Sequence, residues 1–95
     1  MSVQFICTYH AAERMQQRAI PQFVIDLLFI CGSDMRAGGA DRLIFDKAAL
    51  RRLRRHLGGE RALRMIERWL DVYAVVSDSG VLVTVAHQTR RHRRP

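Results

Sequence analysis

The chain has 95 residues, of which 48% are hydrophobic and 26% charged, a composition that fits one folded domain and excludes a disordered chain. No uncharged stretch approaches the roughly 20 apolar residues of a membrane-spanning helix, and the N-terminus lacks the basic start of a signal peptide, so we expect a soluble, cytoplasmic protein without membrane contact. The formal net charge is +7, which favours an anionic partner.

The first part of the chain predicts a short strand followed by two helices. Residues 3–9 favour an extended strand, and Thr8 can cap a helix over 10–19. Pro21 ends that helix, because the residue before a proline is pushed out of the helical region. A second helix is predicted over 21–31, and it should be buried because it is apolar almost all round.

The middle of the chain predicts a loop, a short strand and a third helix. Residues 33–41 contain a Gly-Gly pair and favour a loop, and residues 42–45 are a candidate strand. Asp46 is a good N-cap for a helix over 47–57, whose leucines recur at i, i+3 and i+7. The arginines of this helix fall off the leucine stripe, so the helix should carry a basic face.

The C-terminal part predicts a fourth helix over 60–69 and then a β-hairpin. Two strand-favouring runs, 72–76 and 81–86, flank a turn that contains Ser-Gly, as in an antiparallel hairpin. We expect one domain over residues 1–88 and a basic tail over 89–95. The predicted fold class is α+β, with helices packed on a small antiparallel sheet that ends in a C-terminal hairpin.

Cysteine and ligand-binding motifs point to no metal and no cofactor. Cys7 and Cys31 lie in apolar surroundings, where buried, reduced thiols are the usual outcome. The sequence has no Cys-x-x-Cys or His-x-x-x-His pair for zinc. It also has no glycine-rich phosphate loop and no Gly-x-Ser-x-Gly nucleophile elbow.

The basic residues gather in the second half of the chain. Residues 1–50 hold five basic and five acidic side chains, whereas residues 51–95 hold eleven arginines and four acidic side chains. A guanidinium group matches phosphate oxygens and stacks on bases, so nucleic acid is the expected partner. A GC-rich genome that favours arginine codons, together with solubility, is the alternative explanation. The arginines expected to bind nucleic acid here are Arg51, Arg52, Arg54 and Arg55 on the third helix and Arg90 and Arg91 in the tail.

A histidine and two arginines share one face of the first predicted helix. His10, Arg14 and Arg18 are spaced i, i+4 and i+8, so they fall within an arc of about 80°. Arginines can hold a phosphate and stabilise developing charge, and a histidine with a pKa of about 6.5 can transfer protons near neutral pH. The spacing therefore indicates either a catalytic stripe or a solvated basic face that starts at His10.

The last predicted strand offers a second set of candidates. Thr84 and Ala86 share one face of this strand, and His87 lies on the other. His87 can serve as a general acid or base in RNA cleavage, where the substrate's own 2′-hydroxyl is the nucleophile and no metal is needed. A polar residue at a strand exit explains His87 equally well. Tyr73 on the partner strand should be half-buried.

The segment His10-Ala-Ala-Glu-Arg-Met-Gln-Gln-Arg-Ala-Ile-Pro21 resembles the N-terminal signature of a small bacterial domain-of-unknown-function family. In that signature a His-Ala pair precedes Arg-Met, a second Arg and then Ile at these spacings. The C-terminal hairpin and basic tail are also similar to that family and, more loosely, to RelE/ParE-type toxins. The resemblance covers residues 8–32 and 70–92.

The resemblance implies a RelE/ParE-like fold, metal-independent RNA cleavage and an acidic antitoxin-like partner. It makes His10 and Arg14 active-site candidates and Arg18 a phosphate contact. It also places Thr84 at the motif threonine of the last strand, makes Arg90 a weaker candidate, and sets Ala19 where the family often has glycine.

Three hypotheses follow from the residues and the resemblance together. The first is a RelE-like toxin that cleaves RNA without a metal, with His10 or His87 handling protons. The second is a non-catalytic nucleic-acid-binding protein, and the third is a basic module that docks an acidic partner protein. A homodimer is compatible with each, because a chain this short buries a small share of its own surface.

Overall fold

The computed structural model describes residues 6–88, apart from the side chains of Ile6 and Ala37, and its elements alternate between helices and strands. In chain order they are β1 (Ile6–Cys7), α1 (Tyr9–Gln17), α2 (Gln22–Cys31), β2 (Ser33–Ala37), β3 (Ala40–Ile44), α3 (Lys47–Leu57), α4 (Glu60–Met65), a 3-10 turn η1 (Glu67–Trp69), β4 (Val72–Ser77) and β5 (Val81–His87).

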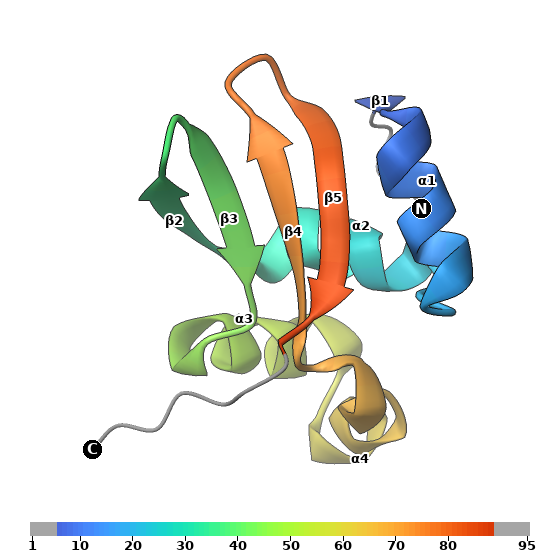
Figure 1. The fold of residues 1–95 in the computed structure, drawn as a ribbon. Coiled ribbons are helices and arrows are strands. Elements are labelled where there is room, and N and C mark those ends of the chain that lie inside the picture. Colours follow the sequence, from blue (N-terminus) through green and yellow to red (C-terminus); the bar gives the residue numbers. More distant parts are fainter. Residues whose placement is uncertain (1–5, 89–95) are drawn as a thin grey trace.

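The strands form one sheet in the order β1-β5-β4-β3-β2. All neighbours are antiparallel except β1, which runs parallel to β5. In Figure 1, α2 crosses behind the sheet and α1 lies beside β5, while α3 and α4 lie at the end of the sheet opposite the hairpin turns. The predicted α+β fold, with helices on a small antiparallel sheet and a C-terminal hairpin, is confirmed, and β1 adds a parallel edge pair.

The predicted cap and end of the first helix can be compared with the structure residue by residue. Thr8 caps α1 as predicted, because its Oγ1 accepts a hydrogen bond from the Ala11 N–H at 3.0 Å. The helix ends at Gln17, so Arg18 and Ala19 lie beyond it. Ala19 has φ of 52°, a left-handed conformation that costs an L-residue energy and favours glycine. The alanine thus occupies a strained position where the resembling family often has glycine.

Helix α2 is buried, as its apolar composition predicts. Val24, Ile25 and Leu28 pack with the inner faces of β4 and β5 in one core cluster. On another side of the helix, Leu27 and Cys31 pack in a second cluster with α3 and α4. The helix therefore joins the sheet to the helical end of the molecule.

The prediction of a loop over residues 33–41 is wrong. This segment forms most of an antiparallel hairpin, with the register running from Ser33 opposite Ile44 to Ala37 opposite Ala40. Gly38 and Gly39 form its turn with φ of 59° and 82°, both in the region that a type I′ turn requires. The candidate strand over 42–45 is part of β3.

The third helix follows its prediction closely, and the fourth does not. α3 spans Lys47–Leu57, and the Asp46 carboxylate accepts the Ala49 N–H at 2.9 Å as its cap. The helix predicted over 60–69 breaks at Ile66, where the Ile66 N–H bonds to the Leu63 carbonyl. Such i→i−3 bonds tighten the chain into the 3-10 turn that follows.

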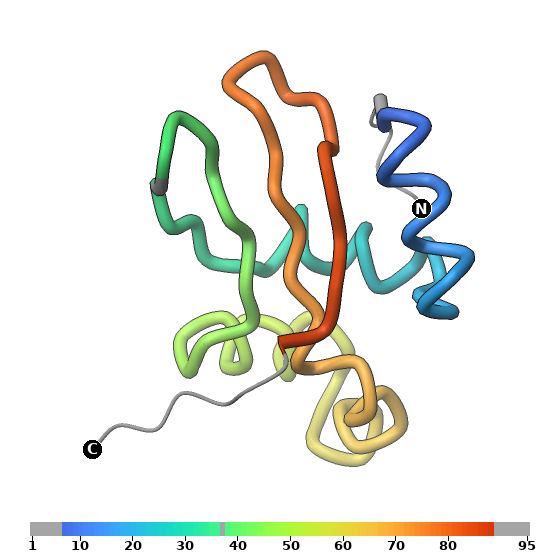
Figure 2. Tube along the Cα trace, in the orientation of Figure 1, coloured from blue at the N-terminus to red at the C-terminus, as the bar shows by residue number. Residues whose placement is uncertain are grey.

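The predicted C-terminal hairpin is confirmed, with one irregularity. Val76 pairs with Leu82 while Val75 pairs with Thr84, so Val83 is the extra residue of a β-bulge. The bulge allows Leu82 and Val85, three positions apart, to be buried on the same side. The chain trace shows the two hairpins side by side, with their turns at the same end (Figure 2).

Neither cysteine forms a disulfide in the structure. Cys31 is buried and Cys7 is half-buried. Burial raises the pKa of the Cys31 thiol, and the nearby charge of Arg52 opposes that rise. Within residues 6–88, no helix has both the length and the apolar character needed to cross a membrane.

Candidate nucleic-acid interface

The first pair of predicted catalytic residues lies together on α1. Arg14 Nε donates a hydrogen bond to His10 Nε2 at 3.3 Å, which requires that Nε2 carry no proton. His10 is exposed and Arg14 is half-buried. Arg18 follows the end of the helix and is exposed, without a side-chain partner among residues 6–88.

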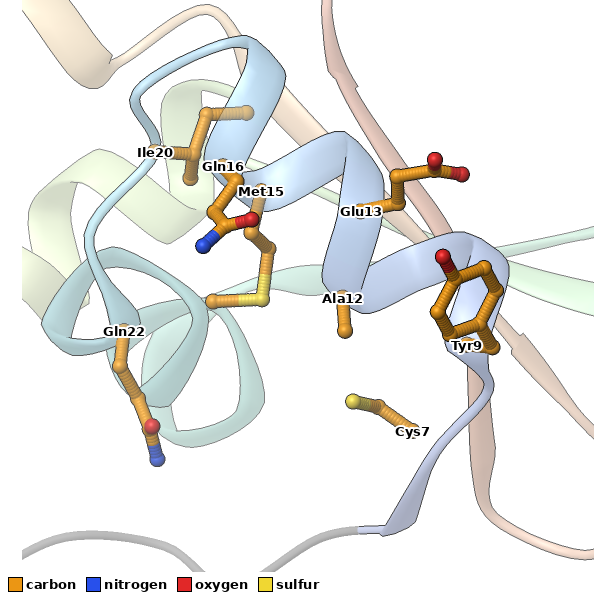
Figure 3. A pocket seen from close by; sticks show the side chains of 8 residues that line it. All are labelled: Cys7, Tyr9, Ala12, Glu13, Met15, Gln16, Ile20 and Gln22. Atoms are coloured by element: carbon orange, nitrogen blue, oxygen red, sulfur yellow. The ribbon is translucent and has the colours of Figure 1, made fainter.

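A hollow of about 550 Å³ lies beside α1, between β1 and the start of α2 (Figure 3). Cys7, Met15 and Ile20 supply apolar surface, and Glu13 and Gln16 supply polar groups. His10, Arg14 and Arg18 do not line this hollow. The hollow and the basic stripe of α1 are therefore separate features.

His87 pairs with a carboxylate that the sequence did not single out. Its Nδ1 lies 2.7 Å from Asp71 Oδ1, and the Gln88 N–H bonds to the Asp71 carbonyl at 2.8 Å. A carboxylate at Nδ1 orients the ring and leaves Nε2 available for another partner. Asp71 was missed because it lies sixteen positions away. The hairpin register would have found it, since Val72 pairs with His87.

The predicted residues of β5 do not join those of α1. The Thr8 N–H bonds to the Leu82 carbonyl at 3.0 Å, so α1 starts beside the beginning of β5. His87 lies at the other end of this strand, roughly 16 Å away at about 3.3 Å per residue. The structure therefore places His10 and His87 at opposite ends of β5.

Thr84 lies on the sheet face away from the buried residues. It pairs with Val75, which in turn pairs with Arg42. The Arg42 guanidinium lies 4.5 Å from the centre of the Tyr73 ring, and Tyr73 is half-buried as predicted. Thr84 therefore neighbours this cation–π pair and is remote from both histidines' hydrogen-bond partners.

Helix α3 turns a row of cations outward. It buries Ala49 and Leu53 completely, and Lys47, Arg51 and Arg55 recur at i, i+4 and i+8 on the opposite side. All three are exposed, and within residues 6–88 none of them has a hydrogen-bond, ion-pair or ring partner. We call these three residues the α3 basic face.

Two of the predicted nucleic-acid-binding arginines have partners within the fold. Arg52 donates from Nε to the Cys31 carbonyl at 3.0 Å and from Nη2 to Ser33 Oγ at 2.9 Å. Cys31 ends α2, so Arg52 satisfies a carbonyl that has no partner in its own helix. Arg54 pairs with Glu60 at 2.9 Å. Both arginines thus connect elements of the fold.

The positive charge of the described chain lies at the end formed by α3, α4 and η1. Residues 46–71 hold eight Lys and Arg side chains and four Asp and Glu side chains, whereas the other described residues hold four and five. Arg61 and Arg64 are exposed on α4, and Arg68 stacks on the Trp69 ring at 5.1 Å. Arg90 and Arg91 lie outside the described residues.

Comparisons with known proteins add no identity. No protein-family model matches the chain, and searches against curated proteins and solved structures gave no significant match. The similarity to RelE/ParE-type toxins therefore rests on the quoted motifs alone and stays a prediction. Among the described residues, no three His, Cys, Asp or Glu side chains gather as a metal site would require.

Proposed function

We propose that the protein binds nucleic acid, with RNA as the first candidate, through the α3 basic face. The observation that carries this proposal is that Lys47, Arg51 and Arg55 are exposed and have no partner among the described residues. An arginine already paired with a carboxylate must lose that partner to bind a phosphate, whereas these three side chains lose nothing.

The shape of the α3 basic face favours a polymer over a small anion. Lys47 and Arg55 are separated by roughly 12 Å along the axis, at about 1.5 Å per residue. A row of this length spans more than one phosphate of a nucleic acid chain. Arginine also stacks on unpaired bases, which favours a single-stranded region.

The salt dependence of binding tests this proposal. We would measure the anisotropy of labelled single-stranded RNA with the wild type and with the Arg51→Gln/Arg55→Gln variant. The slope of log affinity against log salt should fall by roughly 1.4, at about 0.7 per single-strand phosphate contact. A DNA strand of the same sequence, titrated in parallel, separates RNA from DNA preference.

A matched double variant makes the result specific. Arg18→Gln/Arg42→Gln removes the same two charges from the end of α1 and from the sheet, and should leave the slope unchanged. Equal losses in the two variants would mean that net charge alone drives binding. An unchanged slope in the Arg51→Gln/Arg55→Gln variant would move the interface away from α3.

The Asp71–His87 pair favours a second candidate function, metal-independent RNA cleavage. With Asp71 at Nδ1, the Nε2 atom of His87 can accept the proton of an RNA 2′-hydroxyl. The 2′-oxygen then bonds to the adjacent phosphorus and the bond to the 5′-oxygen breaks. The products are a 2′,3′-cyclic phosphate and, after protonation of the leaving oxygen, a 5′-hydroxyl.

Two histidine variants separate the candidate sites for cleavage. Labelled RNA would be incubated in excess chelator with the wild type, His10→Ala and His87→Ala, and resolved on a denaturing gel. Loss of cleavage in His87→Ala, with RNA binding retained, supports the Asp71–His87 site. Loss in His10→Ala instead would move the chemistry to α1. Intact RNA with the wild type would contradict cleavage and leave the binding proposal standing.

A further inference from the structure

Strand β2 forms an open edge of the sheet. It pairs with β3 on one side and is the last strand in the order. Asp34, Met35 and Arg36 are exposed, with half of Met35 accessible (50%). An outer strand presents main-chain N–H and C=O groups that a second strand can pair with.

The hairpin register decides which main-chain groups point outward. The residues that flank a two-residue turn, here Ala37 and Ala40, form a hydrogen-bonded pair, and such pairs alternate with non-bonded pairs along the ladder. Met35 opposite Arg42 is therefore a bonded pair. It follows that the main-chain groups of Asp34 and Arg36 face away from β3.

We propose that two copies of this chain associate through their β2 strands, antiparallel about a twofold axis at Met35. This register joins the outward main-chain groups of Asp34 in one copy to those of Arg36 in the other, and the twofold axis repeats the contact. Opposite charges placed directly across a strand pair stabilise it. The contact is isologous, as in most homodimers.

Charge selects this register among those that the backbone allows. A shift by two residues in one direction places Asp34 opposite Asp34 of the second copy, and in the other direction places Arg36 opposite Arg36. Like charges directly opposite are destabilising. Charged edge strands usually prevent pairing with unrelated strands, and here the same charges favour self-pairing in one alignment.

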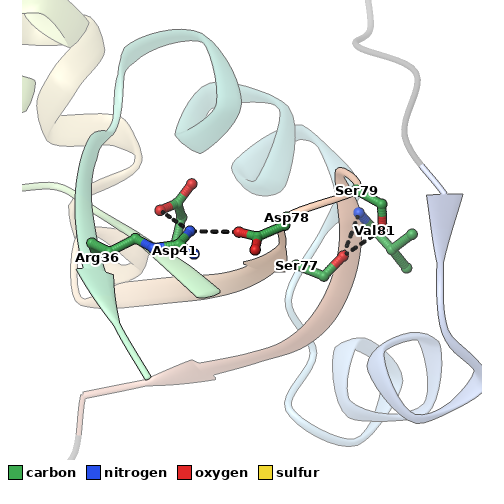
Figure 4. A network of polar contacts seen from close by, with 6 residues as sticks. All are labelled: Arg36, Asp41, Ser77, Asp78, Ser79 and Val81. Carbon is green, nitrogen blue, oxygen red and sulfur yellow. Dashed lines mark hydrogen bonds and ion pairs between the residues drawn. The ribbon is translucent and has the colours of Figure 1, made fainter. Parts of the chain in front are cut away.

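The contacts of Arg36 hold the edge in place without using all of its donors. Its Nη1 contacts Asp41 at 3.2 Å and Asp78 at 2.6 Å, which ties β2 to the turn between β4 and β5 (Figure 4). A guanidinium has five N–H donors, so donors remain for the Asp34 carboxylate of a second copy. Asp34 itself has no side-chain partner among residues 6–88.

Crosslinking at the twofold axis tests the register. In the proposed dimer, Met35 faces Met35 of the second copy as a non-hydrogen-bonded pair, with Cα atoms about 4.5 Å apart, within disulfide range. Met35→Cys in a Cys7→Ser background should therefore form a disulfide dimer under mild oxidation on a non-reducing gel. The control is Met65→Cys, since Met65 on α4 is more exposed (77%). Equal crosslinking of both variants, or none at Met35→Cys, would overturn the register.

A charge reversal tests the interaction without crosslinking. Asp34→Lys places two lysines opposite the two Arg36 side chains and should shift sedimentation from dimer to monomer. Glu13→Lys makes the same change on α1 and should leave the dimer intact, with circular dichroism checking the fold of both. A dimer that persists in Asp34→Lys overturns the proposal, and so does a wild-type chain that stays monomeric at its highest soluble concentration.

Discussion

The two hairpins of the sheet are held by different forces. In β4–β5, the inward-facing side chains are Val72, Ala74, Val76, Leu82 and Val85, and all five are buried. In β2–β3, Leu43 is the one buried side chain among those described. The first hairpin is thus part of the hydrophobic core, whereas the second is mostly exposed.

Polar contacts at both ends of β2 hold the second hairpin. At its tip, Arg36 joins Asp41 and Asp78. At its base, Ser33 Oγ donates to Asp46 Oδ1 at 2.6 Å and accepts from Arg52. Salt and acid act on contacts of this kind more than on buried apolar ones, so one sheet combines a hairpin fixed by burial with an edge that responds to solution conditions.

Removing apolar contacts should separate the two hairpins most strongly. Leu82 is fully buried, so Leu82→Ala should lower the free energy of unfolding by about 2–5 kcal/mol. Met35→Ala on β2 should change it by about 0.5 kcal/mol or less. Urea denaturation, at a protein concentration low enough to keep both variants monomeric, measures the two values. A comparable loss at Met35 would mean that β2 contributes to the core after all.

Removing the polar anchor at the base of β2 should cost less. Asp46 caps α3 and accepts the Ser33 hydroxyl, so Asp46→Ala should lower the free energy of unfolding by about 1 kcal/mol. Asp46→Asn keeps an oxygen for the Ala49 N–H and should lose much less. If the alanine and asparagine variants were equally destabilised in urea, the hydrogen bonds would not be the cause.

The sequence predicted the parts of the fold in which burial follows a regular spacing. The helix over 47–57 and the C-terminal hairpin agree with their predictions because one face of each is apolar. β2 was missed because neither of its faces is buried, so Asp34, Met35 and Arg36 show no apolar alternation. Its strand conformation comes from pairing with β3, which a local pattern does not contain.

The candidate site shows the same limit. The outward position of Arg51 and Arg55 follows from helix spacing and was predicted. The contact of Arg52 with Cys31 joins residues twenty-one positions apart, and the Asp71–His87 pair depends on the hairpin register. Both arise from tertiary structure, so the sequence alone could rank neither.

Two turns allow a reciprocal exchange of glycine and alanine. Gly39 has φ of 82° and space for a methyl group, so Gly39→Ala adds backbone strain alone, about 1–2 kcal/mol. Ala19 already has φ of 52°, and Ala19→Gly should raise the free energy of unfolding by up to about 1 kcal/mol, after the entropic cost of glycine. Thermal denaturation of both variants checks the opposite signs. A loss of stability in Ala19→Gly would show that the alanine is not strained.

Acid should loosen β2 before it affects β4–β5. The hydrogen bond and charge of Arg36 hold the pKa of Asp78 below its ordinary value of 3.8, and the Ser33 hydroxyl and Ala49 N–H do the same for Asp46. A carboxyl whose pKa is lowered by folding stabilises the fold above its unfolded pKa, and this stabilisation is lost as the pH falls through the folded pKa. Amide hydrogen exchange, followed by NMR below pH 4, should therefore lose protection in β2 and β3 while β4 and β5 stay protected. Asp78→Asn should show the loosening at the tip of β2 already at neutral pH. Simultaneous loss of protection in all four strands would mean that the two hairpins unfold as one unit, and that the polar anchors of β2 are not separately sensitive to acid.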